Sequence, residues 1–526
     1  MLKPYKKYVT PLMLAALFAA CAILYFQSLN YGFVYFDDDV LTAGSFEFIS
    51  NYKNIPRFFI SHVLSSFYRP ILILSFSIEA MIFGNLIIGH LTNVLFHIAA
   101  VFLIFIFLKK LEFDKTCVFL FSLIFAVHPA LVQAVAWIPG RNDSMLAVFS
   151  ILSFIFLFDW LKSEKRRGIN YFLFSLAFFL ALFTKETAIV IIAVMPAFMF
   201  LFCKPNDKKD LLTAFIAPIF ISVLYFALRT AALKYIAIPS ASDMVLSLYE
   251  SFPSVFNYAE YSIIPSRIRL IGYILPFDSL TVCSFIIFTI PLAASVFFNI
   301  GRKKIMLFGV FWFVAFLLPT FASPSYYLSH RIYTACIGEL IMFLEFWIGL
   351  SRKIPAIKKY AVFAALALIA VFAAASNVQI KKFQDRITFL ENAAAEEPDA
   401  PSIRLKIIEL YIEKGMIEKA KEQLDKVKPG NKGKYSSKYW ETKAYVCYLE
   451  NNYHAAQQIF EQLIKIDPGN ENALAYLAEI YLIQNRYADA QNFAQKAAQL
   501  HRYNAYRKKR YEEIKNIVSL QKRENE

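Results

Sequence analysis

Residues 87–108 read IIGHLTNVLFHIAAVFLIFIFL, and Lys109-Lys110 follow them directly. A helix needs about 20 mainly apolar residues to cross a bilayer, so this stretch predicts a membrane-spanning helix with a basic end. Ten further stretches have the same character, which makes eleven expected spans. They lie near residues 10–29, 87–108, 116–136, 144–161, 170–184, 187–203, 211–231, 279–300, 305–321, 333–350 and 360–377.

The composition agrees with an all-α membrane domain. The chain of 526 residues is 58% hydrophobic, above the roughly 45–50% apolar content of soluble proteins. Its 54 Phe and 30 Tyr residues are typical of lipid-facing surface and interfacial belts. The apolar character ends near residue 378, so we expect a membrane domain over 1–378 and a polar domain over 379–526.

Lysine and arginine gather in short loops between the expected spans. The six clusters are Lys3/Lys6/Lys7, Lys109/Lys110/Lys115, Lys162/Lys165/Arg166/Arg167, Lys204/Lys208/Lys209, Arg302/Lys303/Lys304 and Arg352/Lys353/Lys358/Lys359. With eleven spans all six lie on one side, which the positive-inside rule makes cytoplasmic. We therefore expect an integral membrane protein with a cytoplasmic N-terminus and a C-terminal domain on the opposite side. The scarcity of disulfide signals and the compact loops favour a bacterial inner membrane, which would make that domain periplasmic.

These clusters also explain the net charge of +15. The chain shows no basic stripe with stacking aromatic residues, so nucleic acid is not expected as a partner. The six cysteines lack the paired spacing of zinc, redox or disulfide motifs.

Polar residues collect in the segments expected to face outward. The triplet Asp37-Asp38-Asp39 follows the first span directly. Adjacent carboxylates at a membrane interface repel one another, so they indicate a bound cation, a proton to move or a cationic partner. A solvated loop is the alternative reading of such a run. Other outward segments carry further charged or polar residues, namely Arg69, Arg141, Asp143, Lys185, Glu186, His330 and Arg331.

Several of these features have two readings. Lys185-Glu186 lies between two apolar runs, where it forms either a paired site or an interfacial turn. His90 and His97 share one helix face, which favours packing over metal binding. His128-Pro129 predicts a helix break, with His128 either donating to a phosphate or serving structure. Residues 245–278, broken by three prolines, predict one or two interfacial or re-entrant helices.

The polar domain carries a helical-hairpin repeat. Residues Trp440, Ala444, Ala456, Phe460 and Pro468 fall at the offsets of a tetratricopeptide repeat. Thirty-four residues later Leu474, Ala478, Ala490 and Ala494 take corresponding positions. A degenerate unit is expected near 401–429, and a charged capping helix or frayed tail over 504–526. Such an α-solenoid binds peptides or proteins on its concave face.

Seven elements in order carry a resemblance to a known family. They are Phe33-Val34 with Asp37-Asp38-Asp39, Tyr68-Arg69-Pro70, Gly89-His90 to His97, His128-Pro129, Trp137-Ile138 to Asp143, Lys185-Glu186, and Ser329-His330-Arg331. Together with the repeats they resemble the tetratricopeptide-containing membrane O-mannosyltransferases and their bacterial relatives, which are glycosyltransferases of the GT-C superfamily.

The resemblance implies a reaction and a set of roles. A sugar such as mannose would pass from a polyprenyl-phosphate donor to an acceptor hydroxyl, on protein Ser or Thr or on a glycolipid, with inversion. Catalysis would involve Asp37, Asp38 and Asp39, with Asp38 or Asp37 as base. The donor phosphate would meet Arg69, Arg141, Lys185, His330 and Arg331, supported by His90, His128, Asp143 and Glu186. Mg²⁺ or Mn²⁺ on Asp37 and Asp38 is a further possibility, since adjacent acids can hold such ions.

Two other classes of protein, a scaffold and a transporter, share some of these features. A non-catalytic scaffold would use the membrane part only to anchor the repeats, but a single span would suffice for that. A transporter would place its polar groups near the membrane midplane, often on broken helices. Here the polar groups gather at one face, which favours the glycosyltransferase.

Overall fold

A computed structural model of the chain describes residues 9–34, 37–41, 45–62, 67–162, 166–203, 208–234, 240–272, 278–322, 327–427, 434–500 and 505–524. Within these ranges the regular elements are helices, and an isolated antiparallel bridge joins Gly272 to Tyr327. The expected all-α class is therefore confirmed. The chain separates into two compact units, Met1–Phe389 and Leu390–Glu526.

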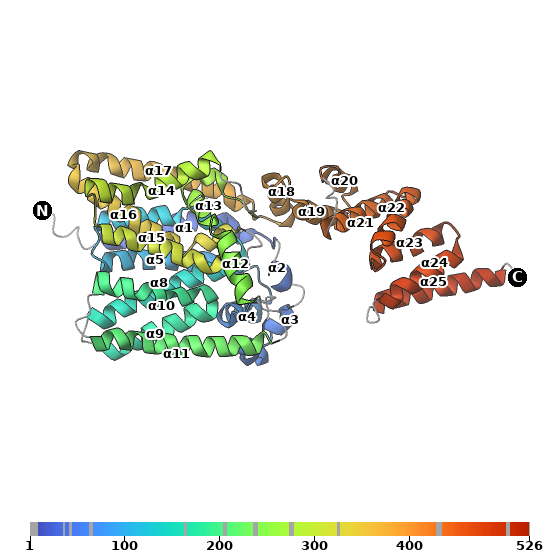
Figure 1. The fold of residues 1–526 in the computed structure, drawn as a ribbon, viewed down its shortest axis with the longest axis horizontal. Helices are drawn as coiled ribbons and strands as arrows, with labels where there is room; N and C mark the ends of the chain where they lie inside the picture. The colour runs from blue at the N-terminus through green and yellow to red at the C-terminus, as the bar shows by residue number, and fades with distance from the viewer. Residues whose placement is uncertain are drawn as a thin grey trace. The chain divides into compact units, whose positions relative to one another are not determined.

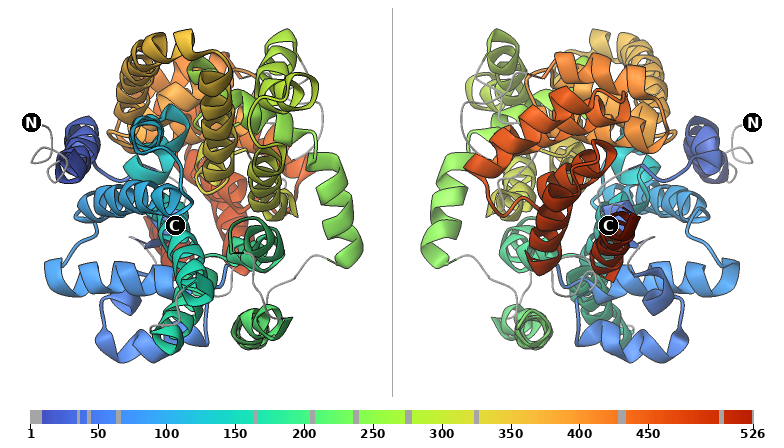
Figure 2. Two further views of the ribbon diagram at one scale, coloured as in Figure 1. Left: turned by 90° about the vertical axis from the view of Figure 1, so that its left-hand side faces the viewer. Right: turned by 90° about the vertical axis from the view of Figure 1, so that its right-hand side faces the viewer.

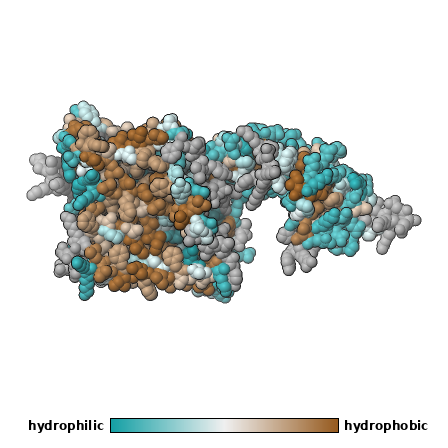
Figure 3. All heavy atoms as spheres, viewed as in Figure 1, coloured by the Kyte–Doolittle hydropathy of each residue, from teal (hydrophilic) through white to brown (hydrophobic). Residues whose placement is uncertain are grey.

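Nine helical segments in the described part of the first unit are long and apolar enough to cross a membrane. They are Val9–Asn30, Gly89–Lys110, Ile138–Lys162, Arg167–Thr184, Glu186–Cys203, Lys208–Ala232, Ser279–Phe298, Lys303–Phe321 and Pro355–Lys381. Each overlaps one of the expected spans, which identifies the chain as an integral membrane protein. Apolar side chains dominate the surface of this unit in Figure 3.

The two remaining expected spans differ from simple helices. Residues 116–136 form α6 (Lys115–Ala126) and a second segment, Pro129–Ala136, bent by 50°. The bend falls at His128-Pro129 because proline cannot continue the hydrogen-bond ladder. Residues 333–350 correspond to α16 (Cys336–Lys353), whose charged residues keep it outside the nine. The count of eleven spans remains a prediction.

The first unit is a bundle of roughly aligned helices (Figure 1). Helix α8 (Arg141–Lys162) packs on α9 (Arg167–Thr184) and on α5 (Gly89–Lys110), while α11 (Lys208–Ala232) packs on α9. Helices α15 (Lys303–Leu317) and α16 approach most closely where Gly309 faces Gly338. Small residues at such a crossing allow backbones to come together, which is a common device in membranes.

Short helices occupy the segments between spans. They are α2 (Asp37–Asp39), α3 (Phe46–Ile49), α4 (Pro70–Phe83), α12 (Ala241–Ser251) and α13 (Ser254–Ile263). Helices α2, α3 and α4 lie together at one end of the bundle in Figure 1. The two expected helices near 245–278 are α12 and α13; the views along the bundle show α12 at its flank (Figure 2).

The second unit contains the expected helical hairpins. They are α19 (Pro401–Glu413) with α20 (Ile417–Asp425), α21 (Lys434–Leu449) with α22 (Tyr453–Ile466), and α23 (Glu471–Ile483) with α24 (Tyr487–Leu500). Their turns place Gly415, Asn451 and Asn485 in the left-handed region, at φ between 60° and 72°. The last two turns are one repeat length apart.

The repeat positions expected from the sequence form the core between hairpins. Ala444, Ala456, Phe460 and Ala490 are completely buried. The chain end forms α25 (Ala505–Glu524), which packs through Ile514 against this core. The charged C-terminal stretch is therefore a capping helix. The sequence 429–433, expected to interrupt the first junction, lies outside the described residues.

The glycine crossing gives a stability prediction. A Cβ added at Gly338 would lie 2.3 Å from the Gly309 carbonyl oxygen, so Gly338→Ala must separate α15 from α16. We expect a loss of about 1–3 kcal/mol, seen as a lower thermal unfolding midpoint in detergent. Gly168→Ala is the matched control, because nothing lies within 4 Å of its added Cβ. An equal midpoint for the two variants would contradict the close crossing.

Candidate functional site

A cavity of about 200 Å³ lies where the ends of several helices of the membrane unit meet. Its walls come from α2, the residues before α4, residues 137–142 at the start of α8, the turn between α9 and α10 (Val190–Phe198), and the segments on either side of residues 323–326. The lining residues are Asp37, Phe67, Arg69, Trp137, Asn142, Lys185, Glu186, Thr187, Pro319, Thr320, Leu328, His330 and Arg331. Six of them were expected from the sequence to form a site.

Two buried ion pairs form one wall of this cavity. The Arg69 guanidinium forms a bidentate ion pair with the Glu186 carboxylate, with Nε–Oε2 and Nη2–Oε1 distances of 3.0 and 2.5 Å. The Lys185 ammonium lies 2.7 Å from both oxygens of Asp143. The consecutive residues Lys185 and Glu186 thereby connect two other helix ends. The reading of this dipeptide as a paired site holds over that of a simple turn.

Lys185 takes a fixed place because the backbone breaks there. Helix α9 ends at Thr184, and Lys185 is extended, with φ −154° and ψ 132°, before the 3-10 turn that opens at Glu186. Burial lowers the pKa of Lys185, and the Asp143 carboxylate opposes that effect. Asp143, which is almost completely buried, therefore holds the ammonium at the cavity wall.

Arg331 supplies a third cation with a different environment. Its Nη1 donates to the Thr320 carbonyl oxygen at 3.4 Å. Among the described residues no carboxylate lies within ion-pair distance of it. Arg69 and Lys185 are paired with Glu186 and Asp143, which leaves the positive charge of Arg331 without an ion-pair partner among the described residues. An anionic ligand group would balance this charge.

His330 is held next to Arg331 by contacts from two sides. Its backbone N–H donates to Gln133 Oε1 at 3.1 Å, and its ring lies 5.5 Å from the Trp137 ring. Burial and the neighbouring cations Lys185 and Arg331 lower the pKa of His330 well below its usual value. The imidazole is therefore neutral at pH 7, and adds no positive charge for a phosphate.

The three aspartates of the triplet have three different environments. Asp37 lines the cavity. Asp38 is 1% exposed and its Oδ2 accepts a hydrogen bond from the Val34 N–H at 2.8 Å. Asp39 forms an ion pair with Arg386. Only Asp37 of the three is in direct reach of a molecule in the cavity.

Burial raises the pKa of both Asp37 and Asp38. For Asp37 the nearby Arg69 guanidinium opposes this shift. For Asp38 burial raises the pKa to about 7, against hydrogen bonds from the Val34 backbone and the Trp137 side chain. Perturbed carboxyl groups in a cavity are candidates for proton transfer.

Arg141 lies behind the cavity rather than in its lining. It is fully buried and pairs with Glu79, with Nη1–Oε1 at 2.8 Å. It also donates to Asn93 Oδ1 at 2.7 Å and to the Gly89 carbonyl oxygen at 3.1 Å. These contacts connect α4, α5 and α8, so Arg141 is engaged in holding the helix ends together.

His90 and His128 also lie outside the lining residues. His90 is buried, with its ring edge-on to Tyr31. His128 caps the break after α6: its Nδ1 accepts from the Ala130 N–H at 3.2 Å, and its Nε2 lies 3.1 Å from the Ser262 carbonyl oxygen. Both ring nitrogens are occupied, which favours the structural reading of His128.

The sequence reasoning missed Trp137 and Asn142 as members of the site. Both lie inside the stretch 137–143 that carried the resemblance, so their position was available but their side chains were not singled out. As for metal, no group of three or more His, Cys, Asp or Glu residues in the described ranges is arranged to hold an ion.

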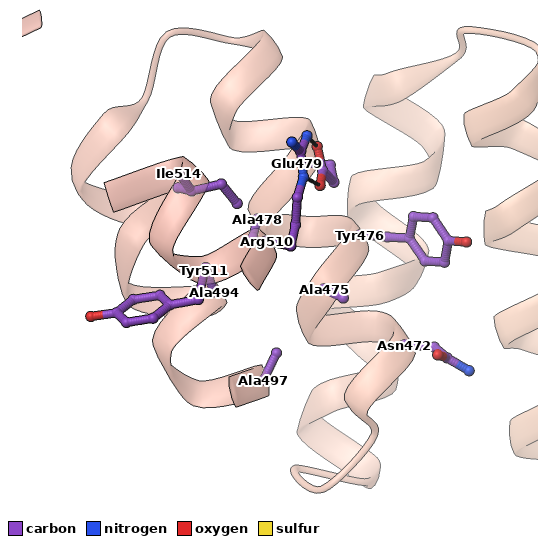
Figure 4. A pocket seen from close by; sticks show the side chains of 10 residues that line it. All are labelled: Asn472, Ala475, Tyr476, Ala478, Glu479, Ala494, Ala497, Arg510, Tyr511 and Ile514. Carbon is purple, nitrogen blue, oxygen red and sulfur yellow. Dashed lines mark hydrogen bonds and ion pairs between the residues drawn. The ribbon is translucent and has the colours of Figure 1, made fainter. Parts of the chain in front are cut away.

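The repeat unit has cavities of its own. One of about 280 Å³ is lined by Glu409, Ile412, Glu413, Lys438, Glu441, Thr442, Tyr445, Asn472 and Tyr476. A neighbouring cavity of about 290 Å³ shares Asn472 and Tyr476 and is drawn in Figure 4. There Arg510 of α25 reaches Glu479 through two bonds of 2.6 Å. The first cavity carries three glutamates and one lysine, so it is acidic.

Fold and site together define a polytopic membrane protein with a charged cavity at helix ends and a helical repeat array. A tetratricopeptide-repeat family model matches residues 381–444 and 448–507. This match confirms the α-solenoid expected from the sequence.

Comparison with curated proteins confirms the family resemblance. The chain is 32% identical to the Drosophila melanogaster protein O-mannosyl-transferase Tmtc1 over 207 residues. This aligned stretch covers 38% of this chain and 22% of that protein. It is 35% identical over 156 residues to human protein O-mannosyl-transferase TMTC2, covering 28% and 18%. Human TMTC1 is 28% identical over 154 residues. The matched stretches thus span about a fifth of these relatives.

The environment of Asp38 gives a pH-dependent stability prediction. Its pKa rises from about 3.9 in the unfolded chain to about 7 in the fold. The folded state thus holds the proton more tightly, and this group's stabilisation is lost as pH rises from about 4 to about 7. Asp38→Asn keeps an oxygen for Val34 and removes the titration. We expect the thermal midpoint to fall less between pH 5 and 8 in this variant than in wild type or Asp39→Asn. Identical pH profiles would contradict the burial of an ionisable Asp38.

Proposed function

We propose that the protein is a membrane glycosyltransferase that moves a sugar from a polyprenyl-phosphate donor to an acceptor hydroxyl. The single observation that carries the proposal is the cavity that joins Asp37 to Lys185 and Arg331. A sugar transfer of this kind needs a base for the acceptor and cations for the phosphate. The relatives named as protein O-mannosyl-transferases support the same class of reaction.

The donor phosphate binds at Arg331 and Lys185, with Arg69 behind them. A phosphodiester carries one negative charge, and Arg331 is the lining cation that has no carboxylate within ion-pair distance among the described residues. When the bond to the sugar breaks, the phosphate gains further negative charge, and preorganised cations stabilise charge that develops in the transition state. The polyprenyl chain remains in the bilayer, beside the apolar face of the bundle.

Asp37 acts as the base. It accepts the proton of the acceptor hydroxyl while that oxygen attacks the anomeric carbon, and the bond from this carbon to the phosphate oxygen breaks. The polyprenyl phosphate leaves with the bonding electron pair, and a single displacement inverts the anomeric centre. Asp38 positions Val34 and Trp137 beside the cavity, and Asp39 holds the segment through Arg386.

The distribution of basic residues supports a location for the site. The site lies at the helix ends opposite to the lysine- and arginine-rich loops, which are cytoplasmic by the positive-inside rule. We place it at the outer face of a bacterial inner membrane, with the repeat unit in the periplasm. The acceptor is a protein bound by that unit. The acidic, tyrosine-lined cavity of the repeat unit selects acceptor segments that carry lysine or arginine near the modified Ser or Thr.

Asp37→Asn tests the base. Proton transfer by a positioned side chain contributes about 10²–10⁴-fold, so we expect transfer in lipid nanodiscs to fall at least 100-fold. Asp39→Asn is the control, because Asp39 belongs to the same triplet but pairs with Arg386. Donors are polyprenyl-phosphate sugars, and the acceptor is a membrane extract. Undiminished transfer by Asp37→Asn would remove Asp37 as the base, and no transfer by wild type from any donor would favour the scaffold.

Burial raises the pKa of Asp37, and a base must be deprotonated to act. We therefore expect wild-type transfer to decline on acidification at a higher pH than it would with an aspartate of ordinary pKa.

Charge reversal tests acceptor docking. Glu413 is exposed and lines the acidic cavity of the repeat unit. Glu413→Lys should raise the apparent KM for protein acceptors several-fold, most strongly at low salt, and leave donor binding unchanged. Glu512→Lys reverses an exposed charge of α25 that is absent from this lining. Equal effects of the two reversals would indicate general electrostatics rather than docking in the cavity.

A further inference from the structure

Two polar atoms of the cavity have no hydrogen-bond partner among the described residues, although both side chains are buried. They are Asn142 Oδ1 and His330 Nδ1. Asn142 is 3% exposed and His330 is 5% exposed, and both line the same cavity as Lys185 and Arg331. A buried polar group without a partner costs about 1–3 kcal/mol. A ligand that forms hydrogen bonds with both atoms would explain why the cavity contains two unpartnered polar groups.

The orientation of Asn142 is determined by its other amide atom. Its Nδ2 donates to the Pro139 carbonyl oxygen at 2.9 Å, which leaves Oδ1 as the free end. An amide oxygen only accepts hydrogen bonds, so its partner must carry an O–H or N–H group. The phosphate diester of a lipid donor carries neither, so this atom does not serve the phosphate.

The His330 ring is also fixed, by Gln133 at its backbone and by the Trp137 ring at its side. Its Nδ1 is buried without a hydrogen-bond partner among the described residues, and its Nε2 lies 3.8 Å from Asp143 Oδ2, beyond hydrogen-bond distance. A neutral imidazole nitrogen pairs with a hydroxyl, which both donates and accepts. Beside it Trp137 contributes an aromatic surface, of the kind that apolar faces of ligands pack against.

We propose that Asn142 and His330 form the subsite for the sugar ring of the donor and recognise it through its hydroxyl groups. This inference rests on the proposed function. Both side chains line one cavity of about 200 Å³, which also holds the cations assigned to the phosphate.

Binding measurements with the full-length protein in nanodiscs test this subsite without the need for an acceptor. The probes are polyprenyl-phosphate mannose, its analogues lacking single ring hydroxyls, and polyprenyl phosphate without a sugar. We expect wild type to bind at least one deoxy analogue about 10-fold more weakly, as for one lost hydrogen bond. Asn142→Ala should remove that discrimination and leave the affinity for polyprenyl phosphate unchanged.

Controls separate this role from others. Asn85→Ala changes an exposed asparagine outside the cavity, and His330→Gln provides a second variant should Asn142→Ala fail to fold. Equal weakening of every probe, including polyprenyl phosphate, would show that Asn142 only supports the structure and would overturn the proposal. Wild type binding polyprenyl phosphate as tightly as the sugar donor would also overturn it, while leaving the phosphate site standing. Failure of wild type to bind any probe would instead refute the proposed function itself.

Discussion

The structure of the site depends on two charges that are neighbours in sequence, Lys185 and Glu186. Buried charges are costly unless they are paired, and in a membrane protein such residues face a polar interior. Here the break after α9 turns Lys185 toward Asp143 and Glu186 toward Arg69, with contacts of 2.7 and 2.5 Å. This pairing draws the ends of α8, α9 and α4 together, and the cavity forms between them. Removal of either acid would leave a buried cation without its partner.

The pairing also divides the charged residues into those that build the site and those that can act in it. Arg141, buried against Glu79, belongs to the first group, as do Asp143 and Glu186. Arg331, which has no carboxylate partner in the described part of the chain, belongs to the second, together with Asp37. A transferase needs both kinds, because cations stabilise developing charge only when they are held in place before the reaction.

Sequence reasoning predicted the features that depend on local pattern. Apolar length gave the spans, His128-Pro129 gave the 50° break, and the 34-residue period gave the hairpins around Ala444 and Ala478. It could not predict which helix ends meet. The partners Arg69 and Glu186 are 117 residues apart, and Arg141 finds Glu79 on the short helix α4, which the sequence had placed in a loop. Asn142 escaped notice because its role depends on an unpartnered atom rather than on its residue type.

The most direct test of this account is a cryo-electron microscopy structure of the protein in a lipid nanodisc with a bound polyprenyl-phosphate sugar. The account predicts density for the phosphate against Arg331 and Lys185, with the sugar between Asp37 and Asn142. Donor density at another helix end, or a phosphate that contacts neither of these two cations, would contradict it.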